Sequence, residues 1–175
     1  MDDDAIGRLL DVAAGRLAAY GYLLTGSQPA SGALVQDAIV KVFVRHRRLD
    51  DTIVAEGLVR AAMRTIHLAQ LRKAASWRAK PQSAARQAEP TQPPDLAAQS
   101  PVGHALALLP AQERAAITLR HHDHLQRQEI AAAMRVPEGV VDGLLSRAHA
   151  TLERTLGEIA PELDQIPIVD ARRRG

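Results

Sequence analysis

The residues best suited to chemistry in this sequence are basic side chains at helical spacing. Arg60, Arg64 and His67 lie four and three positions apart, so they share one face of a helix. The stripe continues toward residue 80 with further cations and the one tryptophan of the chain: Arg72, Lys73 and Trp77. Such a stripe is the electrostatic footprint of a protein that binds a phosphate backbone, and Trp77 is able to stack on a base. The alternative is a solvated helix end, where cations suit the helix dipole.

A second group contains side chains that bind metals, namely His121, His122, Asp123 and His124. No further ligand pair at helical spacing supports a metal site here, and turns commonly carry such residues. The sequence has no cysteine, and it shows neither a glycine-rich phosphate loop nor a nucleophile motif. We therefore expect no metal, no cofactor and no enzymatic activity.

The composition predicts an all-α protein. Of the 175 residues, 46% are hydrophobic but only 2% are aromatic, and the abundant alanine, leucine and arginine favour helices over strands. This length allows one ordinary domain or two small ones, but no large enzyme core. No apolar run approaches the roughly 20 residues of a membrane span. The N-terminus is acidic, unlike a signal peptide. Together with the lack of cysteine, this predicts a cytoplasmic protein that does not enter a membrane.

Residues 81–100 divide the chain, because they are rich in proline, glutamine, alanine and serine and nearly lack large apolar side chains. We interpret them as a flexible linker. It joins two small helical modules, residues 1–80 and residues 101–157, and a tail over 158–175 has no strong pattern. Apolar residues three and four positions apart predict helices near 5–24, 29–48, 53–78, 111–121, 126–134 and 137–156. The second module begins with residues 102–109, and Pro110 after them suits a helix start. The pair near 126–134 and 137–156 has the proportions of a helix-turn-helix.

Several stretches, in the same order along the chain, resemble extracytoplasmic-function sigma factors of the sigma-70 family. Residues 22–26, 34–43 and 55–65 resemble region 2, and the last stretch favours an actinobacterial, SigE-like subgroup. Residues 107–116, 129–134 and 144–148 resemble region 4 with its helix-turn-helix. Each stretch alone is weak evidence, whereas the ordered set with a linker between its halves is fairly specific.

The resemblance implies a dissociable specificity subunit of RNA polymerase that directs promoter recognition and transcription initiation. In this family, region 2 docks on a coiled coil of the largest polymerase subunit and reads the downstream promoter element. Region 4 binds the polymerase flap and inserts its last helix into the major groove of the upstream element. The implied partners are core RNA polymerase, promoter DNA and an anti-sigma factor.

The resemblance also assigns roles to individual residues. Those expected to contact the polymerase are Gln36, Asp37 and Lys41. Those expected at the downstream element are Arg60, Arg64, His67, Arg72, Lys73 and Trp77. Those expected at the upstream element are Ser146, Arg147 and His149.

The sequence departs from the family pattern at three places. Gly32 and Ala33 stand where members usually carry two acids, and losing charges from an interface rim slows encounter. Asp142 and Gly143 lie on the outward face of the last helix, where an acid repels phosphates. Arg135 replaces the glycine usual at the turn, where a left-handed residue is expected.

These departures leave a rival function open: a degenerate sigma-like protein that binds RNA polymerase or a regulatory partner without promoter-specific recognition of DNA. A repressor that uses the C-terminal helix pair alone is a further alternative. Residues 101–157 carry six basic and six acidic side chains. This balance disfavours the repressor, because binding to the phosphate backbone of DNA requires an excess of positive charge.

Overall fold

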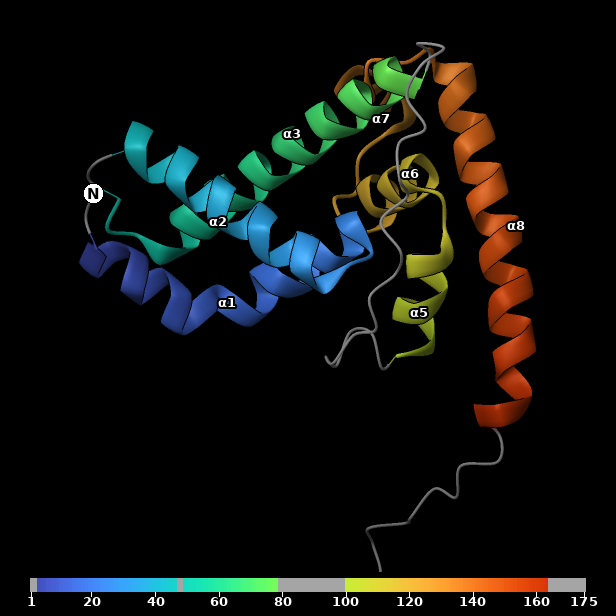
Figure 1. The fold of residues 1–175 in the computed structure, drawn as a ribbon, viewed down its shortest axis with the longest axis horizontal. Coiled ribbons are helices and arrows are strands. Elements are labelled where there is room, and N and C mark those ends of the chain that lie inside the picture. Colours follow the sequence, from blue (N-terminus) through green and yellow to red (C-terminus); the bar gives the residue numbers. More distant parts are fainter. Residues whose placement is uncertain (1–2, 47–48, 79–99, 164–175) are drawn as a thin grey trace, which may run out of the picture.

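The computed structural model describes residues 3–46, 49–78 and 100–163. Within these ranges the chain forms seven α-helices and no strand, which confirms the predicted all-α class (Figure 1). The helices are α1 (Asp3–Thr25), α2 (Gln28–Arg45), α3 (Thr52–Arg78), α5 (Pro101–Leu108), α6 (Ala111–His121), α7 (Arg127–Met134) and α8 (Glu138–Leu163). The predicted linker, apart from Ser100, and the tail from residue 164 onward lie outside the described residues.

The N-terminal module is a three-helix bundle around one hydrophobic core. Large apolar side chains from all three helices are almost fully buried there: Leu9, Leu17 and Leu24 of α1, Phe43 of α2, and Val59 and Met63 of α3. α1 and α2 approach closely at Gly21, where a Cβ atom would collide with the Ser31 hydroxyl. That hydroxyl donates a hydrogen bond to the carbonyl of Ala18 at 2.8 Å, so the buried polar group is satisfied.

The turn between α1 and α2 depends on Gly26, which has a φ of +67°. A residue with a side chain is strained in this left-handed conformation, so glycine is the expected helix C-cap there. The first helix does end at this position, as its sequence predicts. At the start of α3, the carboxylate of Asp51 accepts hydrogen bonds from the backbone N–H groups of Ile53 and Val54 at 2.8 and 3.2 Å. These two N–H groups have no partner inside the helix, and the carboxylate of Asp51 is the acceptor for both.

The C-terminal module consists of α5 to α8, and its core includes side chains of α3. Leu68 is only 4% exposed and lies in one apolar cluster with Leu119 of α6, Ile130 of α7 and Val141 of α8. α3 therefore extends from the N-terminal bundle to α7, and Figure 1 shows the two elements side by side. The sequence predicts two separate modules, whereas in the structure they share part of a core.

Candidate nucleic-acid interface

The outward face of α2 carries the three residues expected at the polymerase. Gln36, Asp37 and Lys41 are all exposed, and the structure therefore brings them together on one surface of the helix. Val40 and Val44 lie on the same face and are 51% and 65% exposed. The sequence reasoning overlooked these two valines, although their spacing relative to Asp37 and Lys41 places them on the same stripe.

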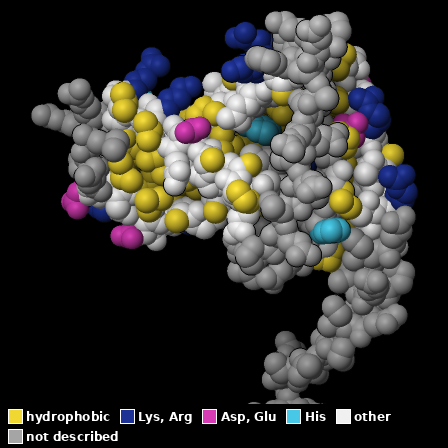
Figure 2. Space-filling model, viewed as in Figure 1, with side chains coloured by type: hydrophobic (Ala, Val, Ile, Leu, Met, Phe, Trp, Pro, Cys, Tyr) yellow, Lys and Arg dark blue, Asp and Glu magenta, His cyan; other side chains and the backbone are white. Residues whose placement is uncertain are grey.

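This stripe combines an exposed apolar centre with charged neighbours. Figure 2 shows hydrophobic side chains gathered over the N-terminal helices on one face of the molecule. Exposed valines in a contiguous group are unusual on a free protein surface and commonly mark a binding site. An apolar centre with a polar rim is the usual composition of a protein–protein interface.

The basic stripe of α3 does lie on one helix face, but most of that face is directed toward other elements. Arg60 forms an ion pair with Glu56 at 2.9 Å, and its guanidinium carbon lies 5.7 Å from the centre of the Tyr20 ring. Arg64 forms an ion pair with Asp123, in the turn after α6, at 3.1 Å. Arg72 donates a hydrogen bond to the carbonyl of Ala133 in α7 at 3.2 Å.

His67 differs most from a residue that faces solvent. It is 5% exposed, and its Nε2 atom has no hydrogen-bond partner among the described residues. Burial lowers the pKa of His67 to about 4, and the nearby charge of Arg114 adds to the shift. At neutral pH this imidazole is uncharged, so it adds no positive charge to the stripe.

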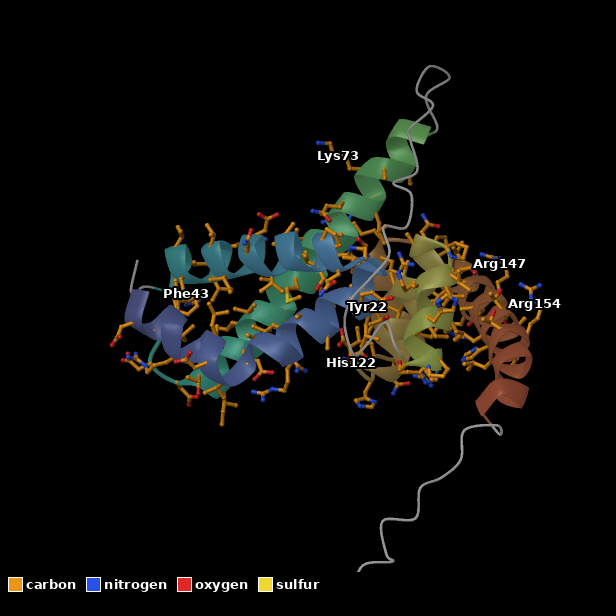
Figure 3. All side chains as sticks on the ribbon, turned by 60° about the horizontal axis from the view of Figure 1, so that its bottom comes forward. Tyr22, Phe43, Lys73, His122, Arg147 and Arg154 are labelled. Atoms are coloured by element: carbon orange, nitrogen blue, oxygen red, sulfur yellow. The ribbon has the colours of Figure 1, made fainter. Side chains whose placement is uncertain are left out.

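Lys73 is the member of the stripe that remains in the open. Its side chain is exposed and points away from the body of the molecule (Figure 3). The side chain of Trp77 lies outside the described residues. Among the cations of α3 whose side chains the structure describes, Lys73 is exposed, whereas Arg60, Arg64 and Arg72 contact neighbouring groups.

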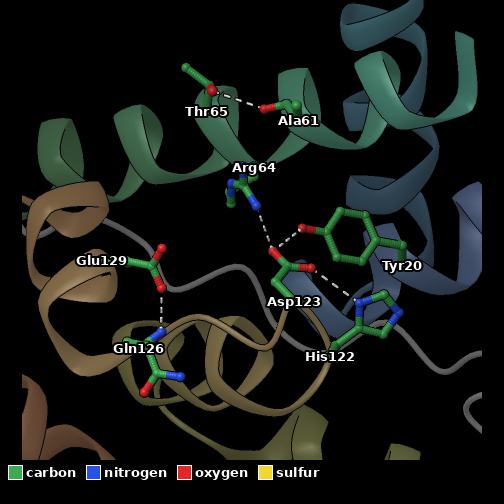
Figure 4. Close-up of polar contacts among 8 residues, drawn as sticks. All are labelled: Tyr20, Ala61, Arg64, Thr65, His122, Asp123, Gln126 and Glu129. Atoms are coloured by element: carbon green, nitrogen blue, oxygen red, sulfur yellow. Dashed lines mark hydrogen bonds and ion pairs between the residues drawn. The ribbon is translucent and has the colours of Figure 1, made fainter. Parts of the chain in front are cut away.

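Asp123 connects the two modules, a role that no local sequence pattern indicates. Its Oδ2 atom accepts hydrogen bonds from the Tyr20 hydroxyl at 2.8 Å and from Arg64 at 3.1 Å (Figure 4). Its Oδ1 atom lies 3.2 Å from Nδ1 of His122. Burial raises the pKa of Tyr20, and the negative charge of Asp123 raises it further. Among the residues that the structure describes, no group of three or more His, Cys, Asp or Glu side chains is placed to hold a metal ion.

The helix-turn-helix is formed by α7 and α8. Gln126 and Glu129 make a reciprocal capping box at the start of α7, in which the Gln126 N–H donates to the Glu129 carboxylate at 2.6 Å. Arg135 ends the helix with φ 58° and ψ 50°. The expectation of a left-handed residue at this turn is therefore confirmed.

The acids on the outward face of α8 are paired with a cation. Arg127 donates to Glu138 at 3.0 Å and to Asp142 at 3.2 Å. The negative charge of Asp142, which the sequence suggested would repel phosphates, is therefore partly neutralised within the motif.

The three residues expected at the upstream element are all exposed on α8. Arg147, labelled in Figure 3, donates to Glu113 of α6 at 2.8 Å. His149 lies with its Nε2 atom 3.1 Å from that of His121. Ser146 lies beside Arg147, and its side chain makes no hydrogen bond to another described residue. Arg147 and His149 thus have partners on α6 in this arrangement. The contact between His121 and His149 is exposed, whereas the side chain of Glu113 is only 10% exposed.

Comparison with known protein families gives a match over the C-terminal module. Residues 100–152 match the family described as Sigma-70, region 4. The matched range contains α5, α6, α7 and most of α8. The C-terminal module is region-4-like.

A comparison with solved structures extends the likeness to the whole fold. The chain is similar to the sigma factor RpoE of Bartonella quintana, solved in complex with the anti-sigma factor NepR. The similarity has a TM-score of 0.52 at 21% sequence identity and covers 87% of this chain and 96% of that one. No curated protein sequence gives a significant match. The fold of this chain is therefore similar to that of this sigma factor.

Proposed function

We propose that the chain is an RNA polymerase sigma factor that directs promoter recognition and transcription initiation. The observation that carries this proposal is the match of residues 100–152 to sigma-70 region 4. The likeness of the whole fold to a solved sigma factor supports it. We assign the chain to the extracytoplasmic-function type, with the SigE-like subgroup as the finer assignment.

The proposed division follows the two modules. Residues 1–80 act as region 2 and residues 101–157 as region 4, joined by residues 81–100. The partners are core RNA polymerase, promoter DNA and an anti-sigma factor, and the protein acts in the cytoplasm without catalysing a reaction of its own. No helix in the described part of the chain is long and apolar enough to cross a membrane.

The α2 surface is the proposed polymerase contact. Gln36, Asp37 and Lys41 supply polar contacts around Val40 and Val44, which supply the apolar centre. A buried apolar centre excludes water from the surrounding hydrogen bonds and makes each of them more effective. The absence of acids at Gly32 and Ala33 is offset in this proposal by the valine pair.

Asp37→Arg tests this contact. The charge reversal places a cation where the polymerase is expected to meet an acid, and unfavourable charge contacts at an interface cost several kcal/mol. We expect retention by immobilised core polymerase to fall roughly tenfold or more. Asp11→Arg is the matched control, because Asp11 is an exposed acid on α1, away from this face. Equal retention of the two variants and the unchanged protein would exclude this face.

DNA contacts are proposed at both ends of the molecule. Downstream contacts involve Arg60, Arg64, His67, Arg72, Lys73 and Trp77, and upstream contacts involve Ser146, Arg147 and His149. Exposure supports Lys73 and Ser146 as DNA contacts. Support is weaker for Arg64, His67 and Arg72, because these three side chains face the C-terminal module.

A second candidate function is a degenerate sigma-like protein that binds the polymerase or a regulator without reading promoters. The ion pairs of Arg127 and Arg147 with acids of the same module favour it, because they use cations that a DNA reader would aim at phosphates. Core binding without a promoter-specific transcript would support this candidate over the first.

A further inference from the structure

The amino end of α8 presents hydrogen-bond acceptors on its outward face. In a helix-turn-helix, the N-terminal residues of the second helix meet the base edges in the major groove. Here this part of α8 carries the carboxylates of Glu138 and Asp142, whose side chains are 43% and 52% exposed. Gly139 and Val140, which are also exposed, offer no polar side chain. A base edge that approaches the amino end of α8 therefore meets two carboxylates.

Arg127 of α7 contacts both carboxylates and orients them. Its Nε atom donates to Glu138 at 3.0 Å and its Nη1 atom donates to Asp142 at 3.2 Å. A carboxylate has about four acceptor sites, so each acid keeps free acceptor capacity after this one contact. The charge of Arg127 and the positive end of the α8 dipole also offset part of the repulsion between the acids and a phosphate backbone.

Ionised carboxylates select the bases that offer a donor. In the major groove, guanine shows only the acceptors N7 and O6, whereas cytosine shows its N4 amino group and adenine its N6 amino group. Adenine also places the acceptor N7 beside its amino group, which repels a second carboxylate oxygen. Cytosine is therefore the base that suits a glutamate or an aspartate best.

The two acids are spaced to read different base pairs. Glu138 and Asp142 lie four positions apart, which is about 6 Å along a helix axis. Successive base pairs of DNA are about 3.4 Å apart, so the two side chains lie roughly two base-pair steps from each other. One carboxylate then has a partner base that the other does not share.

We infer that Glu138 and Asp142 determine the base specificity of the C-terminal module, and that each accepts a hydrogen bond from the N4 amino group of a cytosine in the upstream promoter element. This inference rests on the proposed function, because it names the base that the same surface reads. The acids at these positions then give the module a different base preference, and DNA binding is kept.

Two variants change the chemistry of the acids but hardly their size. Glu138→Gln and Asp142→Asn each replace one acceptor oxygen by a donor amide, and a side-chain amide matches the N6 donor and N7 acceptor of adenine. We therefore expect each variant to select adenine where the parent protein selects cytosine. A purely structural role of the acids predicts no new base preference. Glu153→Gln is the matched control, since Glu153 is an exposed acid of α8 far from its amino end.

The first measurement is a selection of DNA by the holoenzyme. Core polymerase from the same organism is combined with the full chain, and the duplexes that it retains from a library with a long randomised segment are sequenced. We expect the parent and Glu153→Gln to enrich an upstream and a downstream element, with C·G pairs in the upstream one. Each of the other two variants is expected to replace one C·G pair by an A·T pair, with a preference on the order of tenfold. Circular dichroism verifies folding, and either variant alone carries the test if the other fails to fold.

The second measurement identifies which base of the C·G pair is read. The guanine of each such pair is replaced by 7-deazaguanine, which lacks the N7 acceptor and leaves the cytosine amino group unchanged. We expect the holoenzyme to bind this duplex as tightly as the natural one. A loss of affinity on the order of tenfold would show that a cation reads the guanine, and this result would overturn the inference.

The remaining outcomes separate this inference from the proposed function. If both folded variants enrich the same upstream element as Glu153→Gln, the acids do not choose the base, and the inference is wrong while the proposed function stands. If the chain enriches no element beyond those of core polymerase alone, the proposed function is wrong and the inference is rejected with it.

Discussion

At the scale of single residues, sequence periodicity placed side chains on the correct helix faces but could not tell which faces other elements cover. Arg60, Arg64 and His67 do share a face of α3, as predicted. The burial of His67 depends on α6, which follows some 45 positions later in the sequence, so no local pattern reveals it. Leu68, next to His67, was the available signal that this part of α3 packs against something.

His67 makes the stability of the protein depend on pH. Its pKa is about 4 in the folded chain, against an ordinary value of 6.5, so the unfolded chain binds more protons between these two values. The free energy of unfolding is therefore highest above pH 6.5 and decreases as the pH drops from 6.5 to 4. Below pH 4, the titration of His67 lowers it no further. Between pH 7.5 and pH 5 the loss is about 2 kcal/mol.

The measurement is urea unfolding of the parent protein and of His67→Leu at both pH values. We expect the parent to lose about 2 kcal/mol more than the variant on acidification, since leucine does not titrate. Equal losses in the two proteins would mean that His67 is accessible to protons in the folded state.

At the scale of elements, the sequence predicted six of the seven described helices, all but α5, and most of their ends to within a few residues, because the caps are local. Gly26, Pro101 and the capping box at Gln126 each act on the helix next to them. The pairing of Arg127 with two acids of α8 was missed. It joins residues 11 and 15 positions apart across the turn, beyond the reach of helical spacing.

Arg135 supplies a prediction at this scale. In the left-handed conformation, a residue other than glycine is strained by roughly 1–2 kcal/mol. Glycine removes this strain, but it also makes the unfolded chain more flexible, which offsets part of the gain in stability. The side chain of Arg135 is exposed, and no described residue pairs with it. We therefore expect Arg135→Gly to stabilise the protein by up to about 1 kcal/mol in denaturant unfolding.

Arg135→Ala is the control for the lost side chain, because alanine keeps the strain at this φ. It is expected to be no more stable than the parent. If alanine stabilises the protein as much as glycine does, the effect comes from the side chain and not from the backbone of the turn.

At the scale of the whole molecule, the sequence predicted the all-α class but not the contact between the two modules. Composition and helical period are properties of segments, whereas the contact joins α1 and α3 to α6 and α7 through Arg114 and Asp123. A buried arginine and an acid between histidines are ambiguous in a sequence, since both types are common on surfaces. The arrangement of the two modules therefore had to come from the structure.

The central claim is that this chain selects promoters for the polymerase, and transcription in vitro tests it most directly. Core polymerase from the same organism, with and without the chain, transcribes fragmented genomic DNA, and the 5′ ends of the transcripts are sequenced. We expect the chain to concentrate starts at sites that share an upstream and a downstream element, and Asp37→Arg to abolish this pattern. Core binding with start sites scattered as for core polymerase alone would contradict the claim.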